Sequence, residues 1–364
     1  MKEYTRQLDF NNTISFPDGI SPKDVLFFDI ETTGFAPATT ILYLIGCIYY
    51  KESSYYMTQW FADTADSEKD LLTAFISFLN NYKTLIHYNG SGFDIPYIIK
   101  KCHIYGIKCD FSHLNSLDIY KEIQPVKALL KIENLKQKTV EKFLNINRDD
   151  TYSGGELIKI YQDYLHTPTN EALKLLLLHN RDDIIGMTSI MPILNYTELA
   201  EGKYAFKGIE LNTIPTSGLG TRKEVVITLT LNKPVPVRIS NGKDFFYLTA
   251  FKDVLKLCIE VYTDELKFFY PNYKDYYYLP EEDCALHKSV AFYVDKNFRT
   301  KAKAANCYSK KTGTFLPQTE EIVTPYFKID YHDKTTYFEF TEDFNSNDEL
   351  IMDYARYVVG YLIR

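Results

Sequence analysis

The stretch "VLFFDIETTGF" (residues 25–35) decides the first part of the fold, because it sets two acids, Asp29 and Glu31, in an otherwise apolar strand. Residues two apart in a strand point to the same face, so both carboxylates share one face while Phe28 and Ile30 occupy the other. Like charges held side by side resist desolvation unless they are protonated, exposed or joined by a cation. A solvated strand face is the simpler explanation for this pair alone, and a site for Mg²⁺ or Mn²⁺ is the alternative.

The composition is that of an ordinary globular protein with room for two domains. The chain has 364 residues, of which 45% are apolar and 24% charged. No basic start with an apolar run and no stretch near roughly 18 uninterrupted apolar residues is present, so we expect a cytoplasmic protein without membrane association. Six scattered cysteines without a C-x-x-C pair predict reduced thiols. The net charge of −7 excludes a polycation, so nucleic acid would need a local patch or metal ions.

Residues 1–199 are predicted to form an α/β domain with helices packed on a mixed sheet. Three short strands are expected at 24–31, 41–51 and 54–62, and a fourth at 84–90. Between them, residues 67–82 repeat apolar side chains at helical intervals behind Ser67 as the expected cap. From residue 93 to about 196 the pattern is mainly helical.

Residues 200–364 are predicted to form a second, mostly β domain. Its strand-like runs include "EVVITLTL" (224–231), "DFFYLTAF" (244–251), "LKFFYPNYKDYYYL" (266–279), "VAFYVD" (290–295) and "TYFEF" (336–340). The domain closes on a predicted helix, "DELIMDYARYVVGYLI" (348–363). The stretch "SGLGTRKE" (217–224) invites comparison with a phosphate loop, but no strand is predicted before it and no helix after it, so we interpret it as a turn.

Two further stretches carry acids in suggestive contexts. In "LIHYNGSGFDIPYII" (85–99), Asp94 opens a helix, where the free N–H groups and the helix dipole are by themselves a sufficient structural reason for it. In "LLLLHNRDDIIGM" (175–187), His179 and Asp183 are four apart and lie on one helical face. They are either an exposed pair without chemistry, or a proton acceptor beside a metal cluster.

The three stretches "FDIETTG", "HYNGSGFDIPYI" and "HNRDDIIGM", in this order, resemble the three motifs of the DEDD 3′-to-5′ exonuclease superfamily, which has a ribonuclease-H-like fold. Within it, the chain most resembles the bacterial YprB-type family, close to the proofreading domains of family-B DNA polymerases. "YSGGELIKIYQDYL" (152–165) ahead of the third motif strengthens that match. The resemblance covers about residues 22–196.

The resemblance implies a catalytic and metal-binding set of four carboxylates, Asp29, Glu31, Asp94 and Asp183, with His179 as the general base. His179 departs from the family, because the histidine branch usually places four residues between base and aspartate, whereas here three intervene. Asp182 is the rival for the fourth ligand. Two divalent ions, Mg²⁺ or Mn²⁺, about 4 Å apart and bridged by Asp29, would activate a water for attack on a phosphodiester.

Substrate contacts are predicted in both domains. Glu31 and Phe35 would lie near the terminal nucleotide, and Asn89 and Phe93 would contact the sugar or base, although a turn residue and a core aromatic explain them as well. Residues 288–311 carry the further candidates Lys296, Arg299, Lys301 and Lys303, interleaved with Phe292, Tyr293 and Phe298. This mixture suits a single strand of nucleic acid, and a solvated surface would look much the same.

Three functions therefore remain open from the sequence. The first is a metal-dependent 3′-to-5′ exonuclease that acts on RNA or single-stranded DNA. The second is a nucleic-acid-binding module that keeps the fold without useful turnover, which the intact set of acids disfavours. The third is a recruiting protein whose main role lies in the C-terminal domain, with unknown protein partners.

Overall fold

The computed structural model describes residues 1–10, 14–147, 154–215 and 220–364. The chain divides into two compact units: unit 1 holds Met1–Thr197 with Val235–Val237, and unit 2 holds Glu198–Pro234 with Arg238–Arg364. Among the described residues, no helix combines the length and apolar character needed to cross a membrane. All six cysteines are free thiols, three of them buried and three half-buried.

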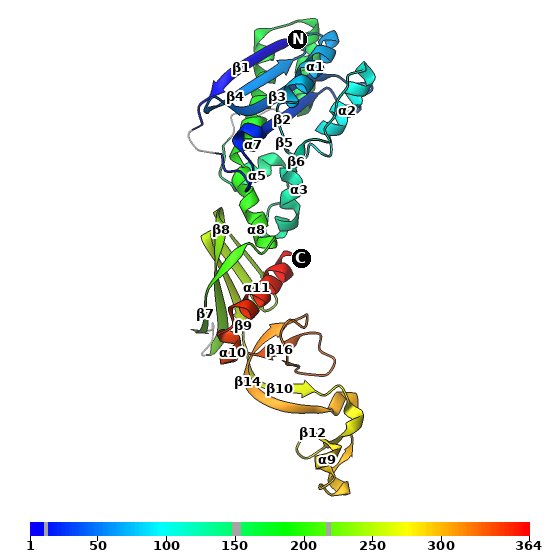
Figure 1. Cartoon of the computed structure of the whole chain (residues 1–364), viewed down its shortest axis with the longest axis vertical. Coiled ribbons are helices and arrows are strands. Elements are labelled where there is room, and N and C mark those ends of the chain that lie inside the picture. The colour runs from blue at the N-terminus through cyan, green and yellow to red at the C-terminus, as the bar shows by residue number, and fades with distance from the viewer. Residues whose placement is uncertain (11–13, 148–153, 216–219) are drawn as a thin grey trace. The chain divides into compact units, whose positions relative to one another are not determined.

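Unit 1 is built on a six-stranded mixed sheet in the order β1-β4-β3-β2-β5-β6 (Figure 1). Its strands are β1 (Lys2–Leu8), β2 (Val25–Thr32), β3 (Leu42–Lys51), β4 (Ser54–Phe61), β5 (Thr84–His87) and β6 (Asn115–Asp118). The first four pair antiparallel, whereas β2, β5 and β6 run parallel. The central strands β2 and β3 are almost wholly apolar because helices cover both faces.

Helices pack on both faces of this sheet. They are α1 (Glu68–Leu79), α2 (Asp94–Tyr105), α3 (Ile119–Ile123), α4 (Lys127–Leu130), α5 (Gln137–Phe143), α6 (Gly154–His166) and α7 (Asn170–Ser189). Helix α1 lies on the face of Phe28, whose ring stacks on Phe75 with centroids 5.7 Å apart. Helix α7 lies on the opposite face, where Asn180 contacts Asp29. The alternation of β2 therefore directs Leu26, Phe28 and Ile30 to α1 and its acids to α7.

The predicted α/β class of unit 1 is confirmed, with three local differences. Strands β1 and β6 were not predicted, because polar runs such as "NSLD" have little strand propensity of their own. They become strands by pairing with neighbouring strands of the sheet. Ser67 does not cap α1 through its side chain. Its hydroxyl instead bonds to Asp63, Thr64 and the N-terminal ammonium group. Tyr152 and Ser153 of the stretch 152–165 lie outside the described residues, and the remainder forms most of α6.

Unit 2 is mostly β, as predicted, and contains three sheets. The first has the order β7-β8-β9, the second β10-β14-β16-β15 and the third β12-β11-β13. Its strands are β7 (Tyr204–Pro215), β8 (Thr221–Lys243), β9 (Phe246–Glu260), β10 (Tyr262–Phe269), β11 (Tyr276–Leu279), β12 (Cys284–His287), β13 (Thr300–Lys301), β14 (Tyr308–Gln318), β15 (Tyr326–Phe327) and β16 (Thr336–Glu339).

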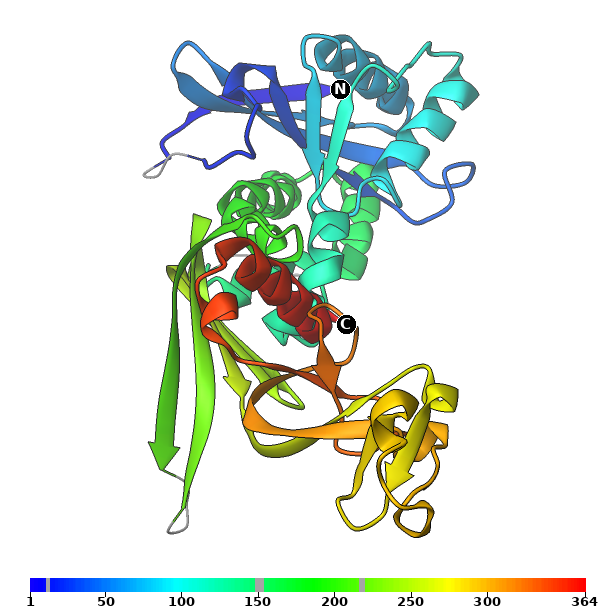
Figure 2. The ribbon, with the colours of Figure 1, turned by 60° about the horizontal axis from the view of Figure 1, so that its bottom comes forward.

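Four helices accompany these sheets. They are α8 (Thr197–Ala200), which begins at the boundary between the units, α9 (Lys288–Ala291), α10 (Glu342–Asn345) and α11 (Asp348–Ile363). Figure 2 shows α11 lying along the first sheet, where Tyr357 and Tyr361 meet Phe246 edge to face. The predicted closing helix is thereby confirmed.

Two predictions for unit 2 are wrong. Residues 290–295 do not form a strand: Val290 and Ala291 belong to α9, and turns follow, because β12 and β13 already occupy both edges of β11. The stretch 217–224 is predicted to have no strand before it, but β7 ends at Pro215, directly ahead of it. Within the stretch, Thr221–Glu224 are strand residues of β8 that pair with β7, so they do not form a turn. Residues 217–219 lie outside the described residues.

Candidate metal centre

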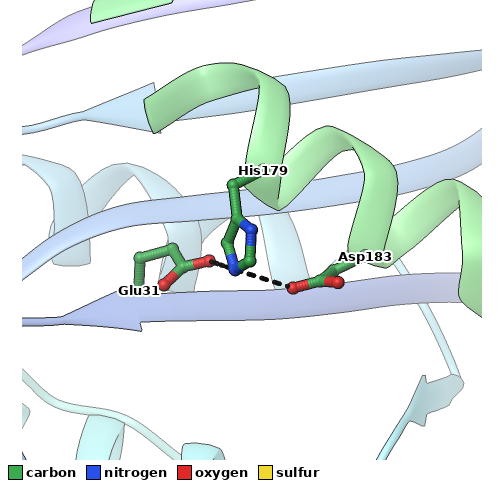
Figure 3. Close-up of side chains that lie close together, drawn as sticks. All are labelled: Glu31, His179 and Asp183. Carbon is green, nitrogen blue, oxygen red and sulfur yellow. Dashed lines mark ion pairs between the residues drawn. The ribbon is translucent and has the colours of Figure 1, made fainter. Parts of the chain in front are cut away.

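Strand β2 and helix α7 bring three of the predicted site residues into one cluster. In the described part of the chain, Glu31, His179 and Asp183 form the one group of acids and imidazoles whose ligand atoms all lie within 4.8 Å of one another. The Nε2 atom of His179 is 3.5 Å from Glu31 Oε1 and 3.3 Å from Asp183 Oδ2. Figure 3 shows His179 reaching from α7 between the two carboxylates.

Asp29 lies beside this cluster, two residues before Glu31 on the same face of β2. Burial raises the pKa of Asp29 well above its usual value, and the neighbouring charges of Asp183, Asp94 and Glu31 raise it further. A hydrogen bond of 3.0 Å from the Asn180 amide to Asp29 Oδ2 opposes this rise in pKa. The electrostatic influence of three other acids indicates that the four predicted carboxylates share one neighbourhood.

Asp94 enters from the first turn of α2 and is only 8% exposed. Burial raises its pKa to about 7, although hydrogen bonds from the backbone N–H groups of Asp94 and Ile30 act in the opposite direction. The bond from Ile30 ties Asp94 to the strand segment between Asp29 and Glu31. The helix start alone therefore does not account for Asp94, because the desolvation of the carboxylate exceeds the stabilisation by the free N–H groups.

A glycine lets α7 approach the sheet closely enough to complete this arrangement. Gly46 of β3 is the pairing partner of Asp29. A Cβ atom at Gly46 would lie 2.1 Å from Asn180 Oδ1 and 2.3 Å from Ile184 Cδ1. Ordinary contacts of a Cβ atom begin near 3.4 Å, so any larger residue would have to displace the Asn180 and Ile184 side chains or the helix that carries them.

The structure separates the two adjacent aspartates of α7. Asp183 faces Glu31 and His179, whereas Asp182 pairs with Arg181 at 2.7 Å. The second oxygen of Asp182 is buried with no hydrogen-bond partner. Asp182 lines a separate cavity of about 360 Å³ with Arg6 and Arg181. The side chain of Asp183, and not that of Asp182, is thus placed for the cluster.

Three supporting residues were not anticipated from the sequence. Asn180 is fully buried, and its Oδ1 accepts a 2.9 Å hydrogen bond from Gln59, which leaves the amide to donate to Asp29. Tyr43 has a pKa raised by burial and by Glu31, so the protonated phenol donates to that carboxylate. The third is Asp118. Only the position of Asn180, inside the third motif, offered a signal in the sequence.

Asp118 fixes the loop that leads to Asp94. Its carboxylate accepts hydrogen bonds from the Asn89 N–H at 2.8 Å, the Ser91 N–H at 3.3 Å and the Ser91 hydroxyl. Asn89 itself takes a left-handed conformation, with φ of 60°, which asparagine tolerates in turns. Asn89 is exposed at its predicted place before Asp94, and its backbone has a structural role.

Two aromatic rings that are close in sequence to the acids contact each other. Phe35, at the loop after β2, is 89% exposed, and its ring meets Phe93 edge to face with centroids 5.8 Å apart. Phe93 directly precedes Asp94 and is half-buried. The predicted lysines and Arg299 belong to unit 2, whereas Asn89, Phe93 and Phe35 belong to unit 1 together with the acids.

The donor set fits a hard divalent cation. Four carboxylates offer oxygen ligands, and the raised pKa values of Asp29 and Asp94 show that the hydrogen bonds these acids accept do not offset their burial. A cation would restore the ionised form of both acids, and its binding would release protons. Asp29, Glu31, Asp94 and Asp183 are the residues that would hold such an ion.

Comparisons with known proteins give one family match and distant structural similarities. Residues 26–195 match the family model described as RNase_H superfamily. No curated protein matches the chain significantly. Among solved structures, a family B DNA polymerase from Pyrobaculum calidifontis is similar at 14% identity and a TM-score of 0.37, covering 70% of this chain and 36% of that one.

A second similar structure is Escherichia coli exonuclease I in complex with an oligonucleotide, at 10% identity and a TM-score of 0.32. It covers 58% of this chain and 55% of that one, so the chain spans about a third to a half of these structures. Sheet order, flanking helices and the match over residues 26–195 together give unit 1 an RNase H-like fold.

Proposed function

We propose that this protein is a metal-dependent nuclease of the DEDD type, a 3′-to-5′ exonuclease that acts on RNA or single-stranded DNA in the cytoplasm. The observation that carries the proposal is the convergence of Glu31, His179 and Asp183 within 4.8 Å, with Asp29 and Asp94 close enough for their charges to interact. Acids from one strand and two helices meet there at an energetic cost to the fold. An RNase H-like scaffold is consistent with phosphodiester chemistry at this place.

The proposed site would use two Mg²⁺ or Mn²⁺ ions. When bound, such ions supply an activated water and stabilise negative charge on the phosphoryl and leaving oxygens. Asp29, Glu31, Asp94 and Asp183 would hold these ions, because the charges of the other three acids all act on Asp29. Asn180 would orient Asp29, and Tyr43 would orient Glu31, through the hydrogen bonds described above.

His179 would act as the general base through Nε2. That atom already points at Glu31 and Asp183, so the spacing of four residues on α7 brings it to the cluster. From this position, Nε2 would take a proton from the attacking water. The exposed ring of Phe35 and its neighbour Phe93 would stack against the terminal base and hold the 3′ end.

The test is a cleavage assay with purified protein and labelled oligonucleotides of RNA and single-stranded DNA. We expect stepwise shortening from the 3′ end in Mn²⁺ or Mg²⁺, no reaction in EDTA, and no cleavage of circular single-stranded DNA. Asp29→Asn and Asp183→Asn should abolish activity. Asp182→Asn is the matched control on the adjacent position and should retain it.

The outcomes separate the candidate functions. Cleavage that persists in EDTA, or in Asp29→Asn and Asp183→Asn, would refute the metal-dependent site. Cleavage of the circular substrate would refute exonuclease action. Binding of oligonucleotides without cleavage under any condition would favour the nucleic-acid-binding module.

A further inference from the structure

Unit 2 exposes an unusual concentration of apolar side chains in one short segment. Of the twelve large hydrophobic residues that are exposed in the described chain, four fall between residues 290 and 298. Phe292 is 73% exposed and Tyr293 is 87% exposed, and their rings are perpendicular with centroids 5.7 Å apart. Grouped exposed aromatics on a folded protein mark a surface for a ligand or partner.

The backbone of this segment is held by contacts with the rest of unit 2, so the exposed rings belong to an ordered part of the surface. Ala291 is fully buried. The Arg299 guanidinium donates to the Ala291 carbonyl oxygen and lies over the Tyr277 ring, 4.8 Å from its centroid. On the other side, buried Ala302 and Cys307 pack with tyrosines of the third sheet. Arg299 is therefore a residue that positions the segment, and we do not count it as a phosphate contact.

Four lysines accompany the rings without forming ion pairs. Lys288, Lys296, Lys301 and Lys303 are exposed, and none of them takes part in an ion pair with any residue described by the structure. The nearby Lys310 differs, because its ammonium group pairs with Asp283 at 2.6 Å.

Within the segment itself, few charges oppose these lysines. The single acid between residues 288 and 303 is Asp295, whose carboxylate accepts a hydrogen bond from the Asn297 N–H. This segment is thus locally basic in a chain whose net charge is −7.

We infer that this segment is an accessory binding surface for single-stranded nucleic acid, separate from the metal centre. The 288–303 surface, as we call it, comprises Phe292, Tyr293, Phe298, Lys288, Lys296, Lys301 and Lys303. Its rings offer faces to unstacked bases, and its unpaired ammonium groups offer charge to the phosphates between them. The inference rests on the proposed function, because a basic surface would help a nuclease with an acidic catalytic unit to retain a polyanion.

The chemistry of the surface distinguishes a single strand from other polyanions. Duplex DNA and acidic peptides present charge without accessible base faces, so they would depend on the lysines alone. An anionic membrane would also take both rings and lysines, and it is therefore the competing occupant that the experiment must exclude.

The test is fluorescence anisotropy of labelled oligo(dT) and oligo(U) with the full chain in EDTA, where hydrolysis cannot interfere. We expect Phe292→Ala/Tyr293→Ala to raise the Kd for single strands by roughly tenfold or more and to leave duplex binding unchanged. Lys296→Ala/Lys301→Ala/Lys303→Ala should weaken both and reduce the salt slope for single strands by about 2.

A matched control is Phe251→Ala/Lys256→Ala, which removes an exposed ring and an exposed lysine from β9 of the same unit. It should bind as the unchanged protein does. Equal Kd values for the control and both surface variants would overturn the inference. So would binding to phosphatidylserine vesicles that depends on Phe292 and Tyr293, together with oligonucleotide binding that does not.

Cleavage of a dinucleotide, whose single phosphodiester would be held by the metal centre itself, tells failure of this inference from failure of the proposed function. We expect the surface variants to cleave it at the rate of the unchanged protein, and Asp29→Asn to leave oligonucleotide binding in EDTA intact. If the surface variants bind oligonucleotides with unchanged Kd but the dinucleotide is cleaved, the inference about the surface is wrong and the proposed nuclease function is supported. If the surface variants lose binding but nothing is ever cut, the surface stands and the nuclease proposal fails.

Discussion

Replacing Asp94 by asparagine should stabilise the metal-free protein at neutral pH, although the same change should abolish metal binding. The carboxyl group is 8% exposed, and burial raises its pKa from 3.8 to about 7. A raised carboxyl pKa means that the folded state holds its proton more tightly than the unfolded state does. The resulting destabilisation is absent below pH 3.8, grows between pH 3.8 and 7, and is complete above pH 7.

The size of the effect follows from the shift in pKa. A difference of about 3 units, at 1.36 kcal/mol per unit, corresponds to about 4 kcal/mol at pH 8 and to about 1 kcal/mol at pH 4.5. The new amide N–H group, if left without a hydrogen-bond partner, would reduce the gain in the free energy of unfolding by about 1–3 kcal/mol at both pH values. The gain from Asp94→Asn should therefore be about 3 kcal/mol larger at pH 8 than at pH 4.5, whatever the amide contributes.

The assay is urea unfolding in EDTA, followed by the fluorescence of Trp60. This is the single tryptophan of the chain, it is 3% exposed, and it lies on β4, so it reports on unit 1. Asp163→Asn, at an exposed position of α6, is the control and should show little change at either pH. Added Mn²⁺ should stabilise the unchanged protein by about 2.7 kcal/mol at 100 times its Kd, and should not stabilise Asp94→Asn.

Two results would refute this reasoning. A stability difference between Asp94→Asn and the unchanged protein that is the same at pH 8 and pH 4.5 would show that Asp94 is not destabilised by burial. Stabilisation of Asp94→Asn by Mn²⁺ equal to that of the unchanged protein would show that Asp94 does not hold the ion.

Three further predictions concern the surroundings of the cluster. Gly46→Ala should push α7 outward by about 1 Å and lower kcat about 100-fold, whereas Gly155→Ala, with open space at its Cβ, should do neither. A kcat of Gly46→Ala within twofold of the unchanged protein would contradict the close packing of α7 on β3. Asn180→Ala should weaken Mn²⁺ binding in calorimetry by about 10- to 100-fold, because Asp29 loses its orienting hydrogen bond, and an unchanged affinity would contradict that role. Burial lowers the pKa of His87 from 6.5 to about 4, so the free energy of unfolding should fall by about 3 kcal/mol as the pH drops from above 6.5 toward 4. Urea unfolding of His87→Gln should show a smaller decrease over this pH range, and an equally large decrease in the variant would contradict the prediction.

The elements that carry the predicted site residues, and the faces that these residues share, were readable from local patterns. The apolar alternation around Asp29 and Glu31 predicts a strand with both acids on one face, and the spacing of His179 and Asp183 predicts one helical face. The structure shows the same facing relations, with Asp183 turned to the cluster and Asp182 turned to Arg181. Period and spacing sufficed here because they concern residues within one element.

The parts that depend on packing between elements were not readable in the same way. Gly46 is one small residue in an apolar strand, and its meaning appears only when β3 pairs with β2 and α7 crosses both. Asn180 needs the same crossing to reach Asp29 over 151 positions of sequence. Strand β6 and its Asp118 likewise exist through parallel pairing with β5, which leaves no pattern in the four residues themselves.

Several features at this end of the sheet are unfavourable for folding when each is taken alone. Asp94 and Asp29 are acids whose charged forms are disfavoured by burial. Gly46 replaces a side chain in a central strand, which costs about 0.5–1 kcal/mol relative to alanine. Phe35 leaves an aromatic ring 89% exposed beside Phe93. A purely structural role explains each of these features poorly. It explains even less why they occur together around one pair of strands and one helix. Residues that are unfavourable for folding are expected to cluster where a functional site is kept at the expense of stability.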